Sequence, residues 1–281
     1  MTGGIFAMVI GAALLHALWN ALVKSGADKT LGIAAVVTGQ GIIAVLVIPF
    51  AAMPDWACWP WLVASIVLHI GYQVFLGNAY RTGDLTQVYP IARGVAPLIV
   101  AAVSVVALGV VLETTELVAI GIIAAGIMSL GLVRQHDGLR NRKAAGLALV
   151  TGCFIAGYSL VDGTGARVAG TGLGFYAWSS LANTVLYAAI GSMVRPGMMR
   201  EVCGMGRVVL IGGGASFVAY AMVVNAFMHA PIALVTALRE TSIVFALLIG
   251  VFFMGERLDL PKVASTMLTL CGAALLRLSR S

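Results

Sequence analysis

Three ionisable side chains lie inside long apolar stretches of this chain, where each one costs free energy. Arg93 lies in the apolar segment 86–109, and the neighbours Arg239 and Glu240 lie in the segment 232–254. Insertion of such a side chain at membrane depth costs about 2.5–3.5 kcal/mol, so residues of this kind typically serve a function. A guanidinium can hold a carboxylate or a phosphate through paired hydrogen bonds. Glu240 could carry a proton, because burial disfavours its charged form, or it could close an ion pair, with Arg93 as the preferred partner.

Two prolines flank Arg93 at positions 90 and 97. Proline lacks a backbone N–H and frees a carbonyl one turn earlier, so the sequence predicts a helix that is interrupted beside a buried cation. Discontinuous helices build binding sites in this way inside membranes. The alternative is an arginine whose head group reaches the nearer interface.

Further polar residues share helix faces inside apolar segments. His16, Trp19 and Asn20 have the spacing i, i+3, i+4, and His69, Tyr72 and Gln73 repeat that spacing. Such faces predict a cavity wall, although a single residue of these types often serves only helix packing, and Asp162 could equally cap a helix end. The candidate substrate-binding residues are His16, Trp19, Asn20, Tyr72, Gln73, Asn78, Tyr89, Arg93, Tyr158, Asp162, Asn225, Arg239 and Glu240.

The elements that must position these residues are apolar runs of membrane-spanning length. Of the 281 residues, 60% are hydrophobic and 10% are charged, against about 25% charged in soluble domains. A span needs about 20 apolar residues, and runs of this length are too long for barrel strands. The predicted fold is therefore an all-α integral membrane protein with ten transmembrane helices, over 3–23, 31–52, 60–80, 86–109, 115–133, 144–163, 172–193, 207–228, 232–254 and 260–277. We interpret the first run as a span and not as a removable signal, because no charged region precedes it.

Several other classes of function find little support in the sequence. The net charge is +6, but the cations lie between apolar runs and not on one polar face, which argues against a nucleic-acid partner. The four cysteines form no close pair and the four histidines are scattered, so we expect neither a disulfide nor a metal site. There is no phosphate-binding loop or dinucleotide motif, so we expect no cofactor and no enzymatic activity.

The polar break at 134–143 lies at the midpoint of the chain and suggests an internal duplication. A shift of 147 positions places Asn78 on Asn225 and Arg93 on Glu240, and a shift of 146 places Gly126 on Gly272. We therefore predict a first five-helix repeat over 1–135, a polar linker over 136–143 and a second five-helix repeat over 144–281. Because five is odd, the second repeat must enter the membrane from the opposite side. Inverted repeats of this kind are a transporter architecture.

The distribution of lysine and arginine predicts the topology. Breaks after odd-numbered spans hold twelve of these residues and the opposite face holds three. Positive loops stay in the cytoplasm, so the odd-numbered breaks are predicted to be cytoplasmic and both termini periplasmic.

The motifs resemble those of a known family. His16-Ala-Leu-Trp-Asn20, Tyr89-Pro-Ile-Ala-Arg-Gly94, Val161-Asp-Gly163, Ala237-Leu-Arg-Glu-Thr241 and Gly255-Glu256 are similar to motifs of the drug/metabolite transporter superfamily, EamA type. The first half departs from the pattern, with Leu112-Glu113 where Gly-Glu is usual. The resemblance implies a central cavity lined chiefly by the first, third, fourth, sixth, eighth and ninth spans, and alternating access without ATP hydrolysis. It also implies cytoplasmic termini, whereas the charges of this sequence indicate the opposite.

These observations together predict a secondary-active transporter of small metabolites. The solutes would be amino-acid-like or other small organic molecules, with an anionic group suggested by the two arginines, and export coupled to protons or to exchange. A membrane-embedded enzyme and a non-transporting membrane subunit are the alternatives. The expected partners are a small-molecule substrate, the lipid bilayer and protons, with the chain a monomer or homodimer in the bacterial inner membrane.

Overall fold

Helices form nearly all of the described chain. The computed structural model describes residues 1–82, 85–133, 142–254 and 260–279, and within these ranges it contains no β-strand. The α-helices are α1 (Gly3–Ser25), α2 (Lys29–Val47), α3 (Trp59–Thr82), α4 (Leu85–Val106), α5 (Thr114–Val133), α6 (Arg142–Ala169), α7 (Gly172–Val194), α8 (Met198–Cys203), α9 (Gly213–His229), α10 (Ile232–Arg239), α11 (Ser242–Met254) and α12 (Leu260–Leu278). Short 3-10 turns η1 (Ile48–Phe50) and η2 (Trp56–Cys58) join α2 to α3, and the π-helical turn η3 (Val208–Gly212) leads into α9.

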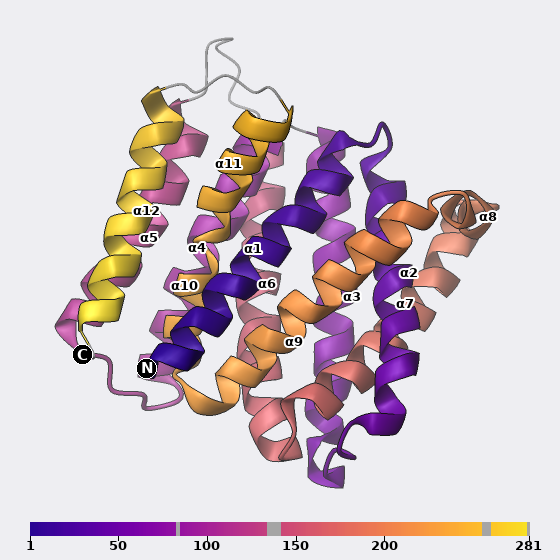
Figure 1. The fold of residues 1–281 in the computed structure, drawn as a ribbon, viewed down its shortest axis with the longest axis horizontal. Coiled ribbons are helices and arrows are strands. Elements are labelled where there is room, and N and C mark those ends of the chain that lie inside the picture. Colours follow the sequence, from indigo (N-terminus) through magenta and orange to yellow (C-terminus); the bar gives the residue numbers. More distant parts are fainter. Residues whose placement is uncertain (83–84, 134–141, 255–259, 280–281) are drawn as a thin grey trace.

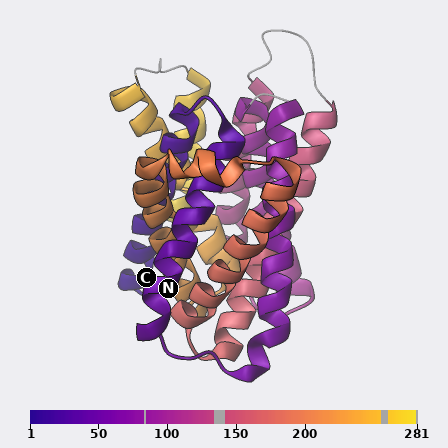
Figure 2. The same ribbon diagram turned by 90° about the vertical axis from the view of Figure 1, so that its right-hand side faces the viewer.

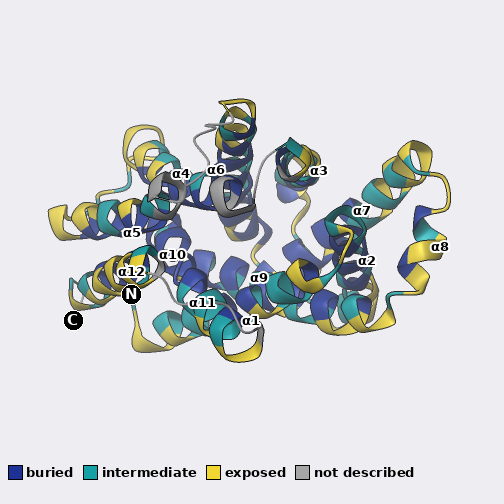
Figure 3. Cartoon of the chain, turned by 90° about the horizontal axis from the view of Figure 1, so that it is seen from above, coloured by how far each residue is buried: buried dark blue, intermediate teal, exposed yellow. Residues whose placement is uncertain are grey.

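The outer surface of the helices is apolar. Six helical segments of the described chain are long and apolar enough to cross a membrane, and three shorter apolar helices accompany them. Large side chains such as Phe50 and Val106 are 90% and 85% exposed. In the view of Figure 3 the exposed residues face outward and the buried residues face the middle. Such an apolar exterior suits lipid and not water.

Each predicted span overlaps helical segments of the described chain, but the position of the helix break differs from the prediction. The helix α4 runs through Pro90 and Pro97 without a break, so the predicted interruption beside Arg93 was wrong. The interruption lies instead between α10 and α11, at Glu240 and Thr241. Proline inside a membrane helix is tolerated where neighbouring groups satisfy the freed carbonyls. At the break, the Thr241 hydroxyl donates to the Leu238 carbonyl at 2.8 Å, and such side-chain bonds compete with helical ones.

The helices form a long bundle with a symmetric arrangement of contacts. Helices α5 and α12 pack together at one end, and α2 packs on α7 at the other (Figure 1). Between them, α3 packs on α6 and α1 packs on α9. The two marked chain ends lie toward the same face, visible again in Figure 2.

Glycines allow the closest helix contacts. A Cβ atom built on Gly126 of α5 would lie 3.1 Å from the Ser265 carbonyl oxygen and 3.1 Å from the Thr269 nitrogen of α12. A Cβ atom built on Gly272 of α12 would lie 3.0 Å from the Ala119 carbonyl oxygen of α5. Each glycine therefore lets the opposite backbone approach, as small residues do in membrane interfaces.

Candidate functional site

A cavity lies between the first three helices and helices α6, α7 and α9. It has a volume of about 90 Å³, which is enough to hold several water molecules. Its lining is mostly aromatic, hydroxyl and amide side chains. The lining residues are His16, Trp19, Ile33, Val36, Val37, Gln40, His69, Tyr72, Gln73, Leu76, Tyr158, Tyr176, Ser179, Ser180, Asn183, Ser216 and Tyr220.

The cavity extends toward the face that carries the break between α1 and α2. Its lining reaches Ile33, in the first turns of α2, and Ile33 also borders a second hollow that includes Asp28, Lys29 and Arg81. Toward the opposite face, Tyr176 packs in a buried hydrophobic cluster with Phe175 and Phe217. Among the described residues, the cavity is thus open toward the face of the break between α1 and α2 and closed by this cluster toward the other.

Arg167 connects two helices on the closed side. Its Nε donates to the Phe227 carbonyl at 2.9 Å and its Nη2 donates to the Ala230 carbonyl at 2.8 Å. These are carbonyls from the C-terminal end of α9, where intrahelical donors are missing. A cation there is also favoured by the helix dipole. Arg167 therefore joins α6 to α9 where the cavity is closed.

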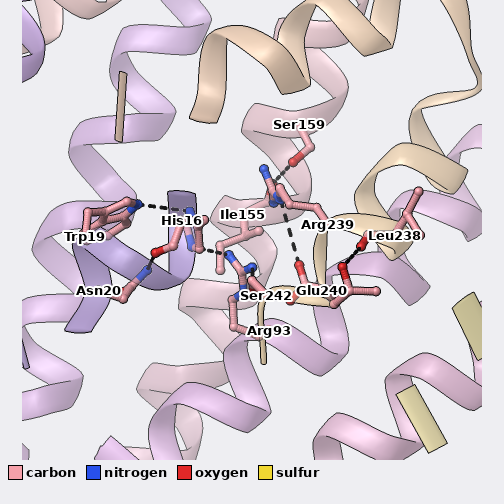
Figure 4. Close-up of polar contacts among 11 residues, drawn as sticks. His16, Trp19, Asn20, Arg93, Ile155, Ser159, Leu238, Arg239, Glu240 and Ser242 are labelled. Carbon is pink, nitrogen blue, oxygen red and sulfur yellow. Dashed lines mark hydrogen bonds and ion pairs between the residues drawn. The ribbon is translucent and has the colours of Figure 1, made fainter. Parts of the chain in front are cut away.

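A charged network lies beside the cavity, where α4 meets the break between α10 and α11. The Arg93 Nε donates to Glu240 Oε2 at 2.7 Å, and its Nη2 donates to the Ser242 hydroxyl at 3.2 Å (Figure 4). Arg93 and Glu240 are 4% and 1% exposed. Glu240 lies between the C-terminus of α10 and the N-terminus of α11, so the two helix dipoles act on its carboxylate in opposite directions. The ion pair that the repeat alignment predicted is therefore present.

His16 links this network to the cavity wall. Its Nε2 lies 3.2 Å from Arg93 Nη1, and its Nδ1 accepts from the Trp19 indole at 3.2 Å (Figure 4). A neutral imidazole offers only one acceptor nitrogen, whereas both neighbours are donors. One of the two contacts is therefore not a hydrogen bond while His16 is neutral.

Arg239 forms a second buried cationic centre. Its guanidinium lies 5.9 Å from the ring centroid of Tyr158 and 5.8 Å from that of Tyr220, at cation–π distances. Its Nε is 3.9 Å from Glu240 Oε1. The Nε and Nη2 atoms are buried and have no hydrogen-bond partner in the described part of the chain. The two tyrosine rings separate this cation from the cavity.

A third polar cluster lies at the inner end of the cavity. Asp162 of α6 is fully buried, and its Oδ2 accepts a hydrogen bond from the Tyr220 hydroxyl at 2.7 Å. The same oxygen is 3.7 Å from His69 Nε2. The His69 ring stacks on Tyr158, with centroids 4.3 Å apart, and lines the cavity.

The structure places the predicted site residues in three settings. Five of them line the cavity: His16, Trp19, Tyr72, Gln73 and Tyr158. Four lie buried behind this lining: Arg93, Asp162, Arg239 and Glu240.

The remaining predicted residues lie elsewhere. Asn20 donates to the carbonyl of His16 at 2.7 Å, and Asn225 contacts the Met8 sulfur at 3.5 Å. Asn78 is exposed near the end of α3. The side chain of Tyr89 lies outside the described residues.

Sequence reasoning missed the contribution of α2 and α7. The lining includes Gln40 from α2 and Ser179, Ser180 and Asn183 from α7, whereas the resemblance implied the fourth and ninth spans instead. Those spans correspond to α4 and α10–α11, which hold the charged network beside the cavity. Gln40 and Asn183 are amide side chains inside apolar runs, and this signal could have identified both helices.

Comparisons with known proteins relate the chain to a family. The sequence model of the EamA-like transporter family matches residues 142–278, so the second half of the chain belongs to this family. No curated protein matches the chain. A solved structure titled "Crystal structure of protein" is similar over 99% of this chain and 98% of its own, with a TM-score of 0.76 and 19% sequence identity. That likeness shows a shared fold, and together with the apolar helices the family makes this a multi-pass membrane protein.

Proposed function

We propose that this chain is a secondary-active transporter of small organic solutes, built from ten transmembrane helices in two inverted five-helix repeats. The observation that carries the proposal is the cavity, to which both halves contribute and which, among the described residues, extends toward the face of the break between α1 and α2. Amino-acid-like solutes suit its hydroxyl and amide lining. Two guanidinium groups and one carboxylate, those of Arg93, Arg239 and Glu240, lie buried behind the lining, and their summed positive charge favours an anionic group on the solute.

Pairs of contacting residues at one sequence offset support the repeat. Arg93 and Glu240 are in contact and 147 positions apart. The Thr184 hydroxyl donates to the Val37 carbonyl at 2.9 Å across the same offset. The contacts of Gly126 and Gly272 are also reciprocal. Gly126 faces Ser265 and Thr269, and Gly272 faces Ala119 and Ile123, which lie 146 positions earlier in the sequence. Two copies of one unit related by a two-fold axis would produce such pairs along that axis.

An asymmetry between the halves supports alternating access. Helix α6 packs on α9 and is joined to it by Arg167, whereas the equivalent helices α1 and α3 barely touch within the described residues. Exchange of these two arrangements between the repeats would close the present mouth and open the other face. With the charge-based topology, the structure corresponds to a state open to the cytoplasm of a bacterial inner membrane.

Flux through purified protein tests the proposal. The protein would be reconstituted into liposomes and supplied with a radiolabelled mixture of amino acids and small organic acids, with protein-free liposomes as the blank. We expect uptake of at least one solute, and counterflow when the same solute is inside. Arg93→Ala should lose this flux, and Glu116→Gln, which alters a buried carboxylate remote from the cavity, should keep it.

Two outcomes would contradict the proposal. Chemical conversion of the solute during uptake would favour a membrane-embedded enzyme. Absence of flux for every solute tested, with folded and correctly inserted protein, would favour a non-transporting subunit.

A further inference from the structure

His69 and Asp162 are placed so that one proton can be held between them. The His69 Nδ1 lies 3.0 Å from the backbone carbonyl oxygen of Ser65. A carbonyl oxygen only accepts hydrogen bonds, so this 3.0 Å contact favours the tautomer with the hydrogen on Nδ1 over the one in which Nδ1 accepts from the Ser65 hydroxyl at 3.4 Å. In the neutral ring, Nε2 then presents a lone pair, and it presents this lone pair to Asp162 Oδ2 at 3.7 Å.

The opposing oxygen is also an acceptor while Asp162 is ionised. A lone pair facing a carboxylate in a buried site is unfavourable, and the Tyr220 hydroxyl already donates to the same oxygen. The second oxygen, Oδ1, is buried without a hydrogen-bond partner within the described residues. One added proton removes this conflict, because it converts either His69 or Asp162 into a donor toward the other.

The location of the pair fits the delivery of a proton from one face of the membrane. The His69 side chain is 18% exposed and lines the cavity, whereas that of Asp162 is 1% exposed and lies one turn beyond Tyr158 on α6, toward the closed side. A proton from cavity water can therefore reach the imidazole, and from it the carboxylate. Exchange of the open and closed sides would expose Asp162 to the other face.

The other titratable and charged groups around the pair come from each neighbouring helix. They are Tyr158 on α6, Tyr176 on α7, Tyr220 on α9 and Arg239 on α10, and the uncharged Ser65 hydroxyl of α3 also lies against Asp162. Only Arg239 among these bears a charge at neutral pH, and the rings of Tyr158 and Tyr220 lie between it and the pair. Protonation of His69 would add a second cation over the Tyr158 ring, so the pair and Arg239 compete for the same aromatic surface.

Glu240, the other buried acid near the cavity, is less suited to this role. Its carboxylate accepts a hydrogen bond from Arg93 at 2.7 Å and lies 3.9 Å from Arg239. Two cations stabilise its ionised form, and the part of the chain that the structure describes places neither oxygen on the cavity wall.

From this geometry we infer that His69 and Asp162 form the proton-binding site that couples transport to the proton gradient, an inference that rests on the proposed function. One proton enters from cavity water, is held between His69 Nε2 and Asp162 Oδ2, and leaves to water on the opposite face. No covalent bond other than those to the proton changes.

Infrared titration of the full chain in lipid nanodiscs tests the site without any solute. Lowering the pH should produce the carbonyl band of a protonated buried carboxyl group in the wild-type protein. Asp162→Asn should lose this band, and His69→Gln, which retains a hydrogen-bonding side chain but cannot bind a proton, should shift the pH at which it appears. Glu116→Gln is the matched control and should keep the band unchanged. A band that survives Asp162→Asn, or that is lost in the control, would overturn the assignment.

A transport measurement separates this inference from the proposed function. Proteoliposomes with a pH-sensitive dye inside would receive the amino-acid and organic-acid mixture, and Asp162→Asn should lose gradient-driven uptake while retaining counterflow. Wild-type-like coupling in Asp162→Asn would reject the proton site while leaving the transporter intact. A wild-type protein without flux would reject the proposed function, and the infrared result would still decide whether the pair binds a proton.

Discussion

The Nε atom of Arg93 lies 2.7 Å from Oε2 of Glu240, and the two residues are separated by the repeat offset of 147 positions. Two equivalent residues that touch must lie beside the axis that relates the proposed repeats. Exchange of the two repeats maps this contact onto itself, so the ion pair is expected in both the inward-open and outward-open states. The pair would then act as a fixed point about which the halves rearrange, and not as a gate that opens in one state.

The first prediction concerns the loss of one member of this pair. Arg93→Ala removes the closer of the two cations at Glu240, and Glu240→Gln removes the carboxylate shared by Arg93 and Arg239. Breaking a buried ion pair in this way costs about 3–5 kcal/mol. We expect both variants to unfold at lower temperature in detergent and to lose flux. The charge-swapped double variant, Arg93→Glu with Glu240→Arg, should recover part of both properties, because the proposed axis makes the two positions equivalent. A double variant no better than either single variant would argue against that equivalence.

A second prediction tests the contact between α5 and α12. Gly126→Ala places a Cβ 2.9 Å from the Cβ of Leu268, so the helices must separate. The overpacking costs about 1–3 kcal/mol, against a gain of up to about 1 kcal/mol from the higher helix propensity of alanine. Gly121→Ala on the same helix is the control, because nothing lies within 4 Å of its Cβ. Thermal unfolding should show Gly126→Ala below Gly121→Ala, and equal stabilities would refute the packing.

A third prediction concerns the closed side. Arg167→Ala removes two bonds from a charged donor to carbonyls of α9, each worth about 1.5–3 kcal/mol. Loss of even one of these hydrogen bonds would shift the equilibrium between the closed and open states of this face roughly tenfold or more toward the open state. Spin labels at Val168 and His229, in a chain without its native cysteines, should report longer distances between α6 and α9. Arg277→Ala, whose guanidinium stacks on Phe6 instead, should leave the distances unchanged; unchanged distances in Arg167→Ala would refute the role.

The sequence was sufficient to predict the helical class and most helix bounds, because lipid imposes a length and an apolar composition on every span. It also predicted the partner of Glu240, since the repeat alignment placed Arg93 at the equivalent position. The broken helix was assigned to the wrong half. Proline predicts a helix break from the sequence, but α4 continues through Pro90 and Pro97. The break at Glu240 instead depends on local hydrogen bonds such as that from the Thr241 hydroxyl to the Leu238 carbonyl.

The pairing of His69 with Asp162 could not be read from the sequence. The two residues lie on different helices, and neither occupies a position equivalent to the other in the repeat alignment. Their contact depends on how α3 packs against α6. The lining contributed by α7 was overlooked for a related reason, because serine and asparagine in a helix also serve packing, and only the tertiary structure shows which of them face a cavity.

A fourth prediction concerns pH and an ion pair outside the spans. The hydrogen bond from Arg195, followed by that from the Leu31 N–H, lowers the pKa of Asp28 from its ordinary value of 3.8. Because the pKa is lowered in the folded state, the pair stabilises the protein above the ordinary pKa, and this contribution is lost as the pH falls through the folded-state pKa. Both side chains are substantially exposed, so the effect should be small and should weaken with salt. Thermal unfolding of Asp28→Asn, which keeps a helix-capping side chain, should match the wild type in acid and fall slightly below it at neutral pH; a deficit that persists in acid would contradict the assignment.

The last prediction concerns the orientation in the membrane. The breaks after odd-numbered spans carry twelve lysines and arginines against three on the other face, and positively charged loops are retained in the cytoplasm. Ser25 lies in the first of these breaks, and Met53, which is 71% exposed, lies between α2 and α3 on the opposite face. In a chain without its native cysteines, a cysteine at position 53 should react with a membrane-impermeant thiol reagent in intact bacterial cells. A cysteine at position 25 should react only after the membrane is permeabilised. The opposite pattern would place the termini in the cytoplasm and the present mouth of the cavity toward the periplasm, so that the same structure would represent the outward-open state.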